Sequence, residues 1–262
     1  MSRLFIAGLL FAAGLFPWQA MAAMHWAPAP IKHSHGGHDR SAGKPYQLID
    51  GKGATASIIT PHLDKSELEV VHQKVVVKPT GMDNYHAIVA TRIQGELFES
   101  ATRYVYMFGK PSGASPSNIM AYEKSPLEIE PAPYAREHWR YYSDTEAVFI
   151  VRFKGKPLSF VDVNVTTSNG STLKLKSDAD GKITVLLPED FETVSKGRRG
   201  NKPAEFILEA QFQASDKKYL TSLSADYHVN PRHWQSTTLG LITIAAGMFL
   251  GLIIIRKRKG KV

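Results

Sequence analysis

Apolar and polar residues alternate with a period of two along most of residues 46–229, and this pattern predicts β-strands. Runs of β-branched and aromatic residues are bounded there by Pro, Gly and Asn, as in ATASIIT, LEVVHQKVVVK, YHAIVATRI and RYVYMFG. The alternation is most regular in residues 146–187, at Phe149, Val151 and Phe153, at Val161, Val163 and Val165, and at Ile183, Val185 and Leu187. Short strands at this spacing predict a mainly β protein built as a β-sandwich.

Turn residues divide this region further. KGKP and SNGS have the composition of hairpin turns, and SDADGK places Gly181 where a positive φ is expected. Residues 109–118, GKPSGASPSN, are expected to be a loop. The proline-rich stretch that follows SPLEIE predicts a boundary within residues 131–144. We therefore expect two β subdomains, residues 46–130 and 145–230.

Two apolar segments lie outside the β region. Residues 1–22 begin with Arg3, continue apolar and end in Ala20-Met21-Ala22, which predicts a signal peptide cleaved after Ala22; the alternative is an uncleaved anchor. Residues 237–255 hold no charge and are followed by the basic residues 256–262. This predicts one transmembrane helix with a cytoplasmic basic tail, against the alternative of a helix buried in a globular domain.

The expected location is therefore the bacterial inner membrane, with the β domains in the periplasm and the C-terminus in the cytoplasm. Gly247 and Gly251 form a G-x-x-x-G pair, a spacing that permits close helix packing. We take it to indicate self-association, or docking to a membrane partner.

Composition excludes several functions. The net charge of +8 comes mainly from residues 256–262, so the β region is nearly neutral and no nucleic-acid surface is expected. The chain has no cysteine, which excludes disulfides and thiolate sites. It also lacks H-E-x-x-H, G-x-S-x-G, a P-loop and a dinucleotide fingerprint, so we expect no enzyme.

One stretch resembles known proteins. GKPLSFVDVNVTTSNG followed by SDADGKITVLLP resembles Ig-like sandwiches of the prealbumin-like and carboxypeptidase-regulatory-like kinds. Upstream, ESATRYVYMFGKPSG, SPLEIEP and HWRYY resemble a family of bacterial periplasmic proteins that is grouped with the periplasmic component of cobalt and nickel uptake systems. The resemblance covers residues 90–235. It implies a histidine close to the mature N-terminus and, in some members, a single membrane helix.

Residues 23–45 are rich in Pro, Gly and His and are expected to be a flexible arm. Cleavage after Ala22 would leave Ala23-Met24-His25 at the N-terminus. The free amine, two amide nitrogens and the His25 imidazole could then form a square-planar N4 site, a geometry that suits Cu(II) or Ni(II). This prediction depends entirely on the cleavage position.

A second group of candidate ligands consists of His33, His35, His38 and Asp39, with two glycines between them. Neutral imidazoles bind Zn, Cu, Ni or Co, although the alternative is a solvated linker without function. Asp226 and His228 alternate on one predicted strand and form a weaker secondary site.

These patterns support three hypotheses. The first is a membrane-anchored periplasmic accessory protein that transiently binds Ni, Co or Cu and assists its uptake or its delivery to a transporter or assembly partner in the same membrane. The second is a non-enzymatic structural or interaction module that docks an envelope protein. The third is a carbohydrate- or peptide-binding domain that uses the loop at residues 109–118.

Overall fold

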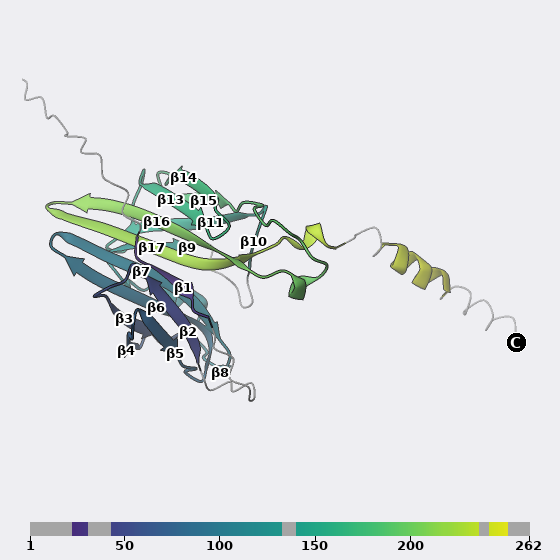
Figure 1. Cartoon of the computed structure of the whole chain (residues 1–262), viewed down its shortest axis with the longest axis horizontal. Helices are drawn as coiled ribbons and strands as arrows, with labels where there is room; N and C mark the ends of the chain where they lie inside the picture. The colour runs from purple at the N-terminus through teal and green to yellow at the C-terminus, as the bar shows by residue number, and fades with distance from the viewer. Residues whose placement is uncertain (1–22, 31–42, 133–139, 236–240, 251–262) are drawn as a thin grey trace, which may run out of the picture.

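The computed structural model describes residues 23–30, 43–132, 140–235 and 241–250, and the protein is mainly β (Figure 1). Two β-sandwiches lie side by side, and one sheet runs through both of them. This confirms the mainly β, sandwich-type fold expected from the sequence.

The N-terminal sandwich packs a three-stranded sheet, in the order β1-β2-β5, against part of the long sheet. The strands of the small sheet are β1 (His25–Pro28), β2 (Lys44–Ile49) and β5 (Lys74–Val77). The long sheet contributes β3 (Thr55–Ile59), β4 (Lys65–Leu68), β6 (Met82–Gln94) and β7 (Leu97–Met107). Trp26, Leu48 and Ile88 are fully buried between the two layers, and they anchor this core.

The C-terminal sandwich has the same two-layer plan. One layer contains β9 (Leu127–Pro131), β11 (Glu146–Phe153), β12 (Lys156–Pro157) and β15 (Lys182–Leu186). The other contains β13 (Asp162–Thr167), β14 (Thr172–Lys176), β16 (Ala204–Ala214) and β17 (Lys217–His228). Phe149, Val151, Val163, Val165 and Val185 are buried between them, as their period of two predicts.

A parallel strand pair joins the two sandwiches. β7 and β17 pair from Leu97↔Lys218 to Thr102↔Leu223, so the β6–β7 and β16–β17 hairpins lie side by side with their turns at the same end (Figure 1). The hydrogen-bonded framework therefore continues across the expected subdomain boundary. β9, expected in the first subdomain, pairs instead with β11 of the second sandwich.

The expected loop at residues 109–118 holds regular structure. β8 (Lys110–Pro111) pairs with β6, and α1 (Pro116–Ala121) begins within it. Ser115 accepts a hydrogen bond from the Ser117 amide and Pro116 occupies the first turn, which together explain the start of this helix. The remaining short elements are β10 (Tyr141–Tyr142), η1 (Arg198–Gly200) and η2 (Pro231–His233).

The expected flexible arm is partly wrong. Residues 23–30 contain β1, which pairs with β2 from His25↔Ile49 to Pro28↔Tyr46, and Ala23, Met24 and Trp26 have no exposed surface. Pro and Gly in the rest of the arm favour irregular structure, so the sequence pattern did not predict this short strand. Residues 31–42 lie outside the described part.

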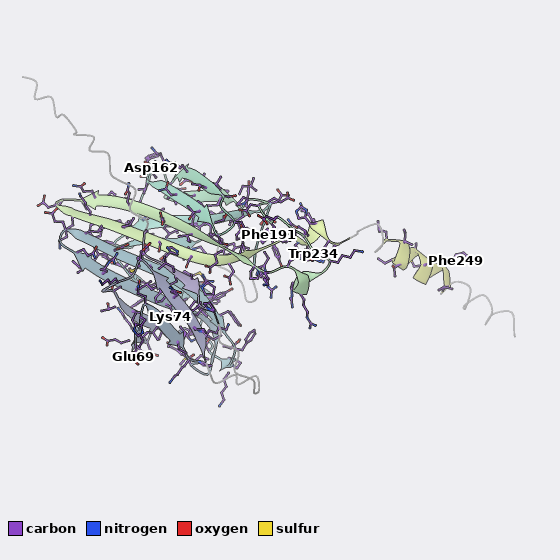
Figure 2. The ribbon with its side chains drawn as sticks, in the orientation of Figure 1. Glu69, Lys74, Asp162, Phe191, Trp234 and Phe249 are labelled. Atoms are coloured by element: carbon purple, nitrogen blue, oxygen red, sulfur yellow. The ribbon has the colours of Figure 1, made fainter. Side chains whose placement is uncertain are left out.

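Residues 241–250 are helical and lie apart from the sandwiches, as Phe249 shows in Figure 2. They form the described portion of the expected transmembrane segment. Within the ranges that the structure describes, no helix has the length and apolar character needed to cross a membrane.

Candidate functional site: a cleft where two paired strands separate

A cleft of about 340 Å³ opens where β7 and β17 stop pairing. Their register ends at Thr102↔Leu223, but β7 continues to Met107 and β17 to His228. The two strand ends therefore form opposite walls of a space between the sandwiches. Five tyrosines are among the residues that line it: Tyr46, Tyr85, Tyr104, Tyr106 and Tyr141.

Arg103 also lines the cleft. Its side chain is 4% exposed and donates to Glu205 Oε1 at 2.8 Å and to Asp226 Oδ1 at 2.5 Å. Its guanidinium also lies 5.5 Å from the centre of the Tyr46 ring. One β7 side chain thereby contacts β16, β17 and β2. One guanidinium thus attracts carboxylates on two other strands, so this group is suited to holding the sandwiches together.

Burial alters the titration of groups in and beside the cleft. It raises the pKa of Glu205 to about 7, although the charge of Arg103 acts in the opposite direction. Burial and the positive charge of Arg140 both lower the pKa of His228. His228 is therefore a neutral imidazole at pH 7, which is the protonation state that binds transition metals.

The expected secondary pair, Asp226 and His228, does line this one cleft. Asp226, however, uses Oδ1 to accept from Arg103. In the part of the chain that the structure describes, no group of three or more His, Asp or Glu side chains is arranged to hold a metal ion.

Ala23 and Met24 directly precede β1, which begins at His25, and the nitrogens expected in the N4 site take part in hydrogen bonds of the fold. The Met24 amide donates to Glu99 Oε1 at 2.7 Å, and His25 Nδ1 lies 3.0 Å from the Ala23 carbonyl oxygen. An N4 site needs the Met24 amide to lose its proton and turn toward the ion. Metal binding by Ala23, Met24 and His25 would therefore require β1 to leave its place in the fold.

His33, His35, His38 and Asp39 lie outside the described residues. The strands on either side of them, β1 and β2, form an antiparallel pair, and the Ala29 amide donates to the Pro45 carbonyl. Lys44, where the chain re-enters β2, lines the cleft together with His228. Topology thus brings both ends of this segment close to the rim of the cleft.

Of the two expected packing glycines, Gly251 is outside the described residues. Gly247 lies in the helix of residues 241–250, and a Cβ built on it would meet nothing within 4 Å. The close helix contact expected there stays a prediction.

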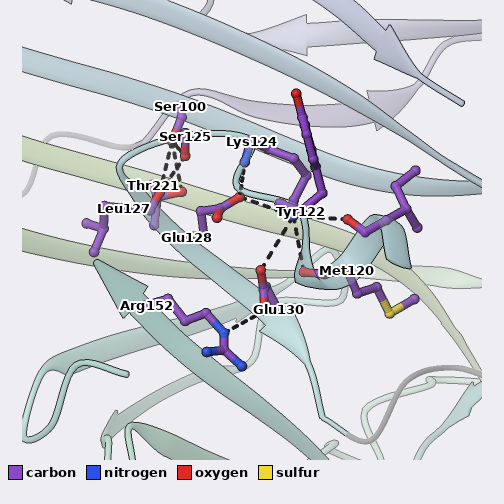
Figure 3. Close-up of polar contacts among 11 residues, drawn as sticks. Ser100, Met120, Tyr122, Lys124, Ser125, Leu127, Glu128, Glu130, Arg152 and Thr221 are labelled. Carbon is purple, nitrogen blue, oxygen red and sulfur yellow. Dashed lines mark hydrogen bonds and ion pairs between the residues drawn. The ribbon is translucent and has the colours of Figure 1, made fainter. Parts of the chain in front are cut away.

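A buried ionic cluster surrounds Lys124 (Figure 3). The fully buried Lys124 ammonium lies 3.2 Å from Glu128 Oε1 and 3.5 Å from Glu130 Oε1, and Glu130 also accepts from Arg152. Burial raises the pKa of Glu128 to about 7, against the opposing charge of Lys124. Lys124 also faces the ring of Tyr104, which lines the cleft. The cluster therefore supports one wall of the cleft.

Sequence reasoning did not identify Arg103, Lys124 or Glu99, nor Glu209, which accepts a hydrogen bond from the Ala23 nitrogen. A usable signal existed for Arg103 and Glu99, since each is a charged residue in the inward-facing register of an apolar strand. Such a residue must find a partner when the strand is buried. The partners come from distant strands, and no local pattern identifies them.

No protein-family model matches the chain, and no curated protein does. Among solved structures, a Ca²⁺-stabilised, ice-binding adhesin of an Antarctic bacterium is 12% identical with a TM-score of 0.27, over 73% of this chain and 45% of that chain. The N-terminal four Ig domains of Dscam1 isoform 4.4 are 10% identical with a TM-score of 0.21, over 78% and 47%. The chain thus spans less than half the length of either structure.

Proposed function

We propose that this protein is a non-enzymatic accessory protein of the bacterial inner membrane that transiently binds nickel, cobalt or copper for a transporter or assembly partner. His33, His35, His38 and Asp39 are the proposed ligands. One observation carries the proposal: residues 31–42 connect two paired strands, so both ends of the histidine segment are held by the fold.

This tethering changes the energetics of ion binding. A free arm loses conformational entropy for every residue that an ion orders. Residues 31–42 connect two strands that are already paired. Folding has therefore closed this loop and removed part of its conformational entropy before any ion binds. The histidines can therefore gather around one ion more readily than they could on a free arm.

The rim of the cleft supplies a further candidate ligand. His228 is neutral at pH 7 and lines the same cleft as Lys44, the residue that follows the histidine segment into β2. We expect His228 to contribute to the affinity for the ion more than Asp226, whose carboxylate is paired with Arg103.

Anchoring to the membrane is part of the proposal. In the helix of residues 241–250 the large apolar side chains are exposed all round, including Leu241, Ile244 and Phe249. A helix that is apolar on every face needs an apolar environment, such as a bilayer. The basic residues 256–262 that follow are those expected on the cytoplasmic side.

Metal titration of the full chain in detergent tests the ligand assignment. We expect the triple variant His33→Ala/His35→Ala/His38→Ala to bind Ni(II), Co(II) and Cu(II) at least about tenfold more weakly than wild type, equivalent to about 1.4 kcal/mol. The control variant His62→Ala/His72→Asn removes two exposed histidines elsewhere and should bind as wild type. Asn is used at position 72 because its φ is positive. Equal affinities of wild type and the triple variant would exclude the proposal.

A second candidate function is an interaction module that docks an envelope protein. It is favoured by Phe108, which is 70% exposed, lines the tyrosine-rich cleft and packs against Tyr106. Aromatic side chains of this kind are enriched at protein interfaces. Cross-linking in the native envelope, with a photoreactive residue at position 108 and a control at exposed Val194, distinguishes the two functions. A partner captured only from position 108, and still captured by the triple histidine variant, would favour this candidate over metal binding.

A further inference from the structure

Two consecutive backbone nitrogens at the start of the described chain point at two carboxylates. The Ala23 nitrogen donates to Glu209 Oε1 at 3.1 Å, and the Met24 nitrogen donates to Glu99 Oε1 at 2.7 Å. Glu99 lies on β7 and Glu209 on β16, so one carboxylate comes from each sandwich. The start of β1 therefore lies across the junction of the two sandwiches.

The surroundings fix this segment closely. Ala23 and Met24 have no exposed surface. Ser222 on β17 donates to the Met24 carbonyl at 2.5 Å, and the Trp26 indole donates to the Ala101 carbonyl at 3.1 Å. Residues 23–26 are thus held by side chains and backbone of strands that follow them by 75 to nearly 200 positions.

The side chains around the Ala23 and Met24 nitrogens hold more negative than positive charge. Glu99 pairs with Arg92, whose Nε donates to Glu99 Oε2 at 3.0 Å. Glu209 adds a second carboxylate, so the three side chains together carry one net negative charge. Burial raises the pKa of Glu209, and repulsion from Glu99 adds to that, while the Ala23 N–H and the charge of His25 lower it. One more positive charge at the Ala23 nitrogen would balance the net negative charge of Arg92, Glu99 and Glu209.

We propose that hydrolysis of the Ala22–Ala23 bond supplies this charge, and that the new α-ammonium group of Ala23 binds Glu209 as a built-in ion pair between the N-terminus and the C-terminal sandwich. The water hydroxyl goes to the Ala22 carbonyl carbon and its hydrogen to the Ala23 nitrogen. The carboxylic acid then releases one proton and the amine takes up one. The amide has one N–H to donate, whereas the ammonium has three and a full charge.

The geometry also sets the order of events. A peptidase must bind several extended residues around the bond that it cleaves, and Ala23 and Met24 are fully buried once β1 has docked. Cleavage therefore precedes the docking of β1. The ammonium then enters its site as the strand closes.

This inference rests on export processing after Ala22 and does not depend on metal binding. It is incompatible with an N4 site at Ala23, Met24 and His25, because a protonated amine and an intact Met24 amide cannot bind Cu(II) or Ni(II). The failure of one proposal can be distinguished from failure of the other, since the histidine segment is left intact in every variant below.

The experiment moves the charge by one residue and leaves the amide in place. One serine is inserted between Ala22 and Ala23 in the full chain, which is exported, processed and purified in detergent. The mature wild type should begin at Ala23 and the variant at the added serine, as mass spectrometry of the intact chains will show. We expect the insertion to lower the thermal unfolding midpoint by roughly 2–4 °C, the shift typical of one modest interaction in a domain of this size.

Glu209→Gln completes a double-mutant cycle. It should lower the midpoint by a similar amount alone, and the insertion should have no further effect in its presence. Glu67→Gln, at an exposed position on β4, is the control and should leave the effect of the insertion unchanged. Additive effects of the insertion and Glu209→Gln overturn the proposal.

A second measurement covers the case in which Glu209→Gln does not fold. The pKa of the Ala23 α-amine, from the pH dependence of its ¹⁵N NMR shift, should lie above the usual range of about 7.7–8.0 in the wild type. In the insertion variant the α-amine belongs to the added serine, and its pKa should lie within that range. A wild-type value within or below that range, or a mature chain that starts at another residue, overturns the proposal.

Discussion

Arg103 on β7 and Asp226 on β17 form an ion pair across the gap that opens where these two strands stop pairing. Glu205 on β16 is the second partner of the same guanidinium. In the paired region, backbone hydrogen bonds join the sandwiches; beyond it, this side chain continues the connection. The cleft thus lies beside a charged bridge that keeps its walls at a fixed separation.

Arg103→Met should destabilise the protein by about 3–5 kcal/mol, because it leaves two partly buried carboxylates without their cation. Denaturant unfolding of the full chain measures this. Arg232→Met removes an exposed arginine and should change the free energy of unfolding by less than about 0.5 kcal/mol. A similar small effect at both positions would contradict the bridging role of Arg103.

Glu205 should make the stability depend on pH. Its pKa rises from 4.5 when unfolded to about 7 in the folded protein, so the folded state holds the proton more tightly. Folding then takes up a proton between these values, and the free energy of unfolding falls as pH rises from about 4.5 to 7. His86 and His228, whose pKa values are lowered by burial from 6.5, act in the opposite direction, because stability is lost as pH falls below that value.

The measurement for Glu205 is therefore a difference between two proteins. Glu205→Gln resembles the protonated form at every pH. Wild type should lose about 1–3 kcal/mol relative to Glu205→Gln between pH 5 and pH 8. Denaturant unfolding at each pH measures this difference. If the free energies of unfolding of the two proteins change equally between pH 5 and pH 8, the raised pKa of Glu205 is wrong.

Lys124→Met should cost about 3–5 kcal/mol, because Glu128 and Glu130 stay buried without the ammonium that faces them. The loss should also move α1, since Lys124 donates to the carbonyls of Ile119 and Met120 at its end. Hydrogen exchange of the α1 amides reports this local change. Lys156→Met, at an exposed position, should alter neither quantity.

Gly181→Ala should be more harmful than Gly53→Ala. Both glycines have a φ between 75° and 79°, so an alanine is strained by about 1–2 kcal/mol at either position. At Gly181, however, a Cβ would lie 2.9 Å from the Leu158 nitrogen and the Val151 oxygen, whereas at Gly53 it would meet nothing within 4 Å. We expect an additional cost of about 1–3 kcal/mol at Gly181. Equal unfolding free energies of the two variants would show that the contact is relieved without cost.

Much of the C-terminal sandwich could be predicted from the sequence. Val163 and Val165 are buried by the period of two, and Gly181 has the positive φ that its turn requires. These features are local, since a strand shows its buried face and a turn shows its glycine within a few residues. The mainly β class followed from them.

The joint between the sandwiches could not be predicted, because it depends on residues far apart in sequence. Nothing near Thr102 indicates that it pairs with Leu223. β1 was missed for a related reason: Trp26 is buried by strands that come much later in the chain, while Pro28 and Pro30 beside it indicate an irregular arm. The candidate site could not be predicted for the same reason, since the partners of Arg103 lie on β16 and β17.

The bond between the Met24 carbonyl and Ser222 spans 198 residues. The first strand can therefore find its place only after the last strand has been made, and the β7–β17 pair must form before either sandwich can be joined to the other. Contacts of such long range close slowly, because a large loop must lose its freedom before the contact is gained. We expect this chain to fold late and as a whole, so that it depends on protection from aggregation until β17 is complete.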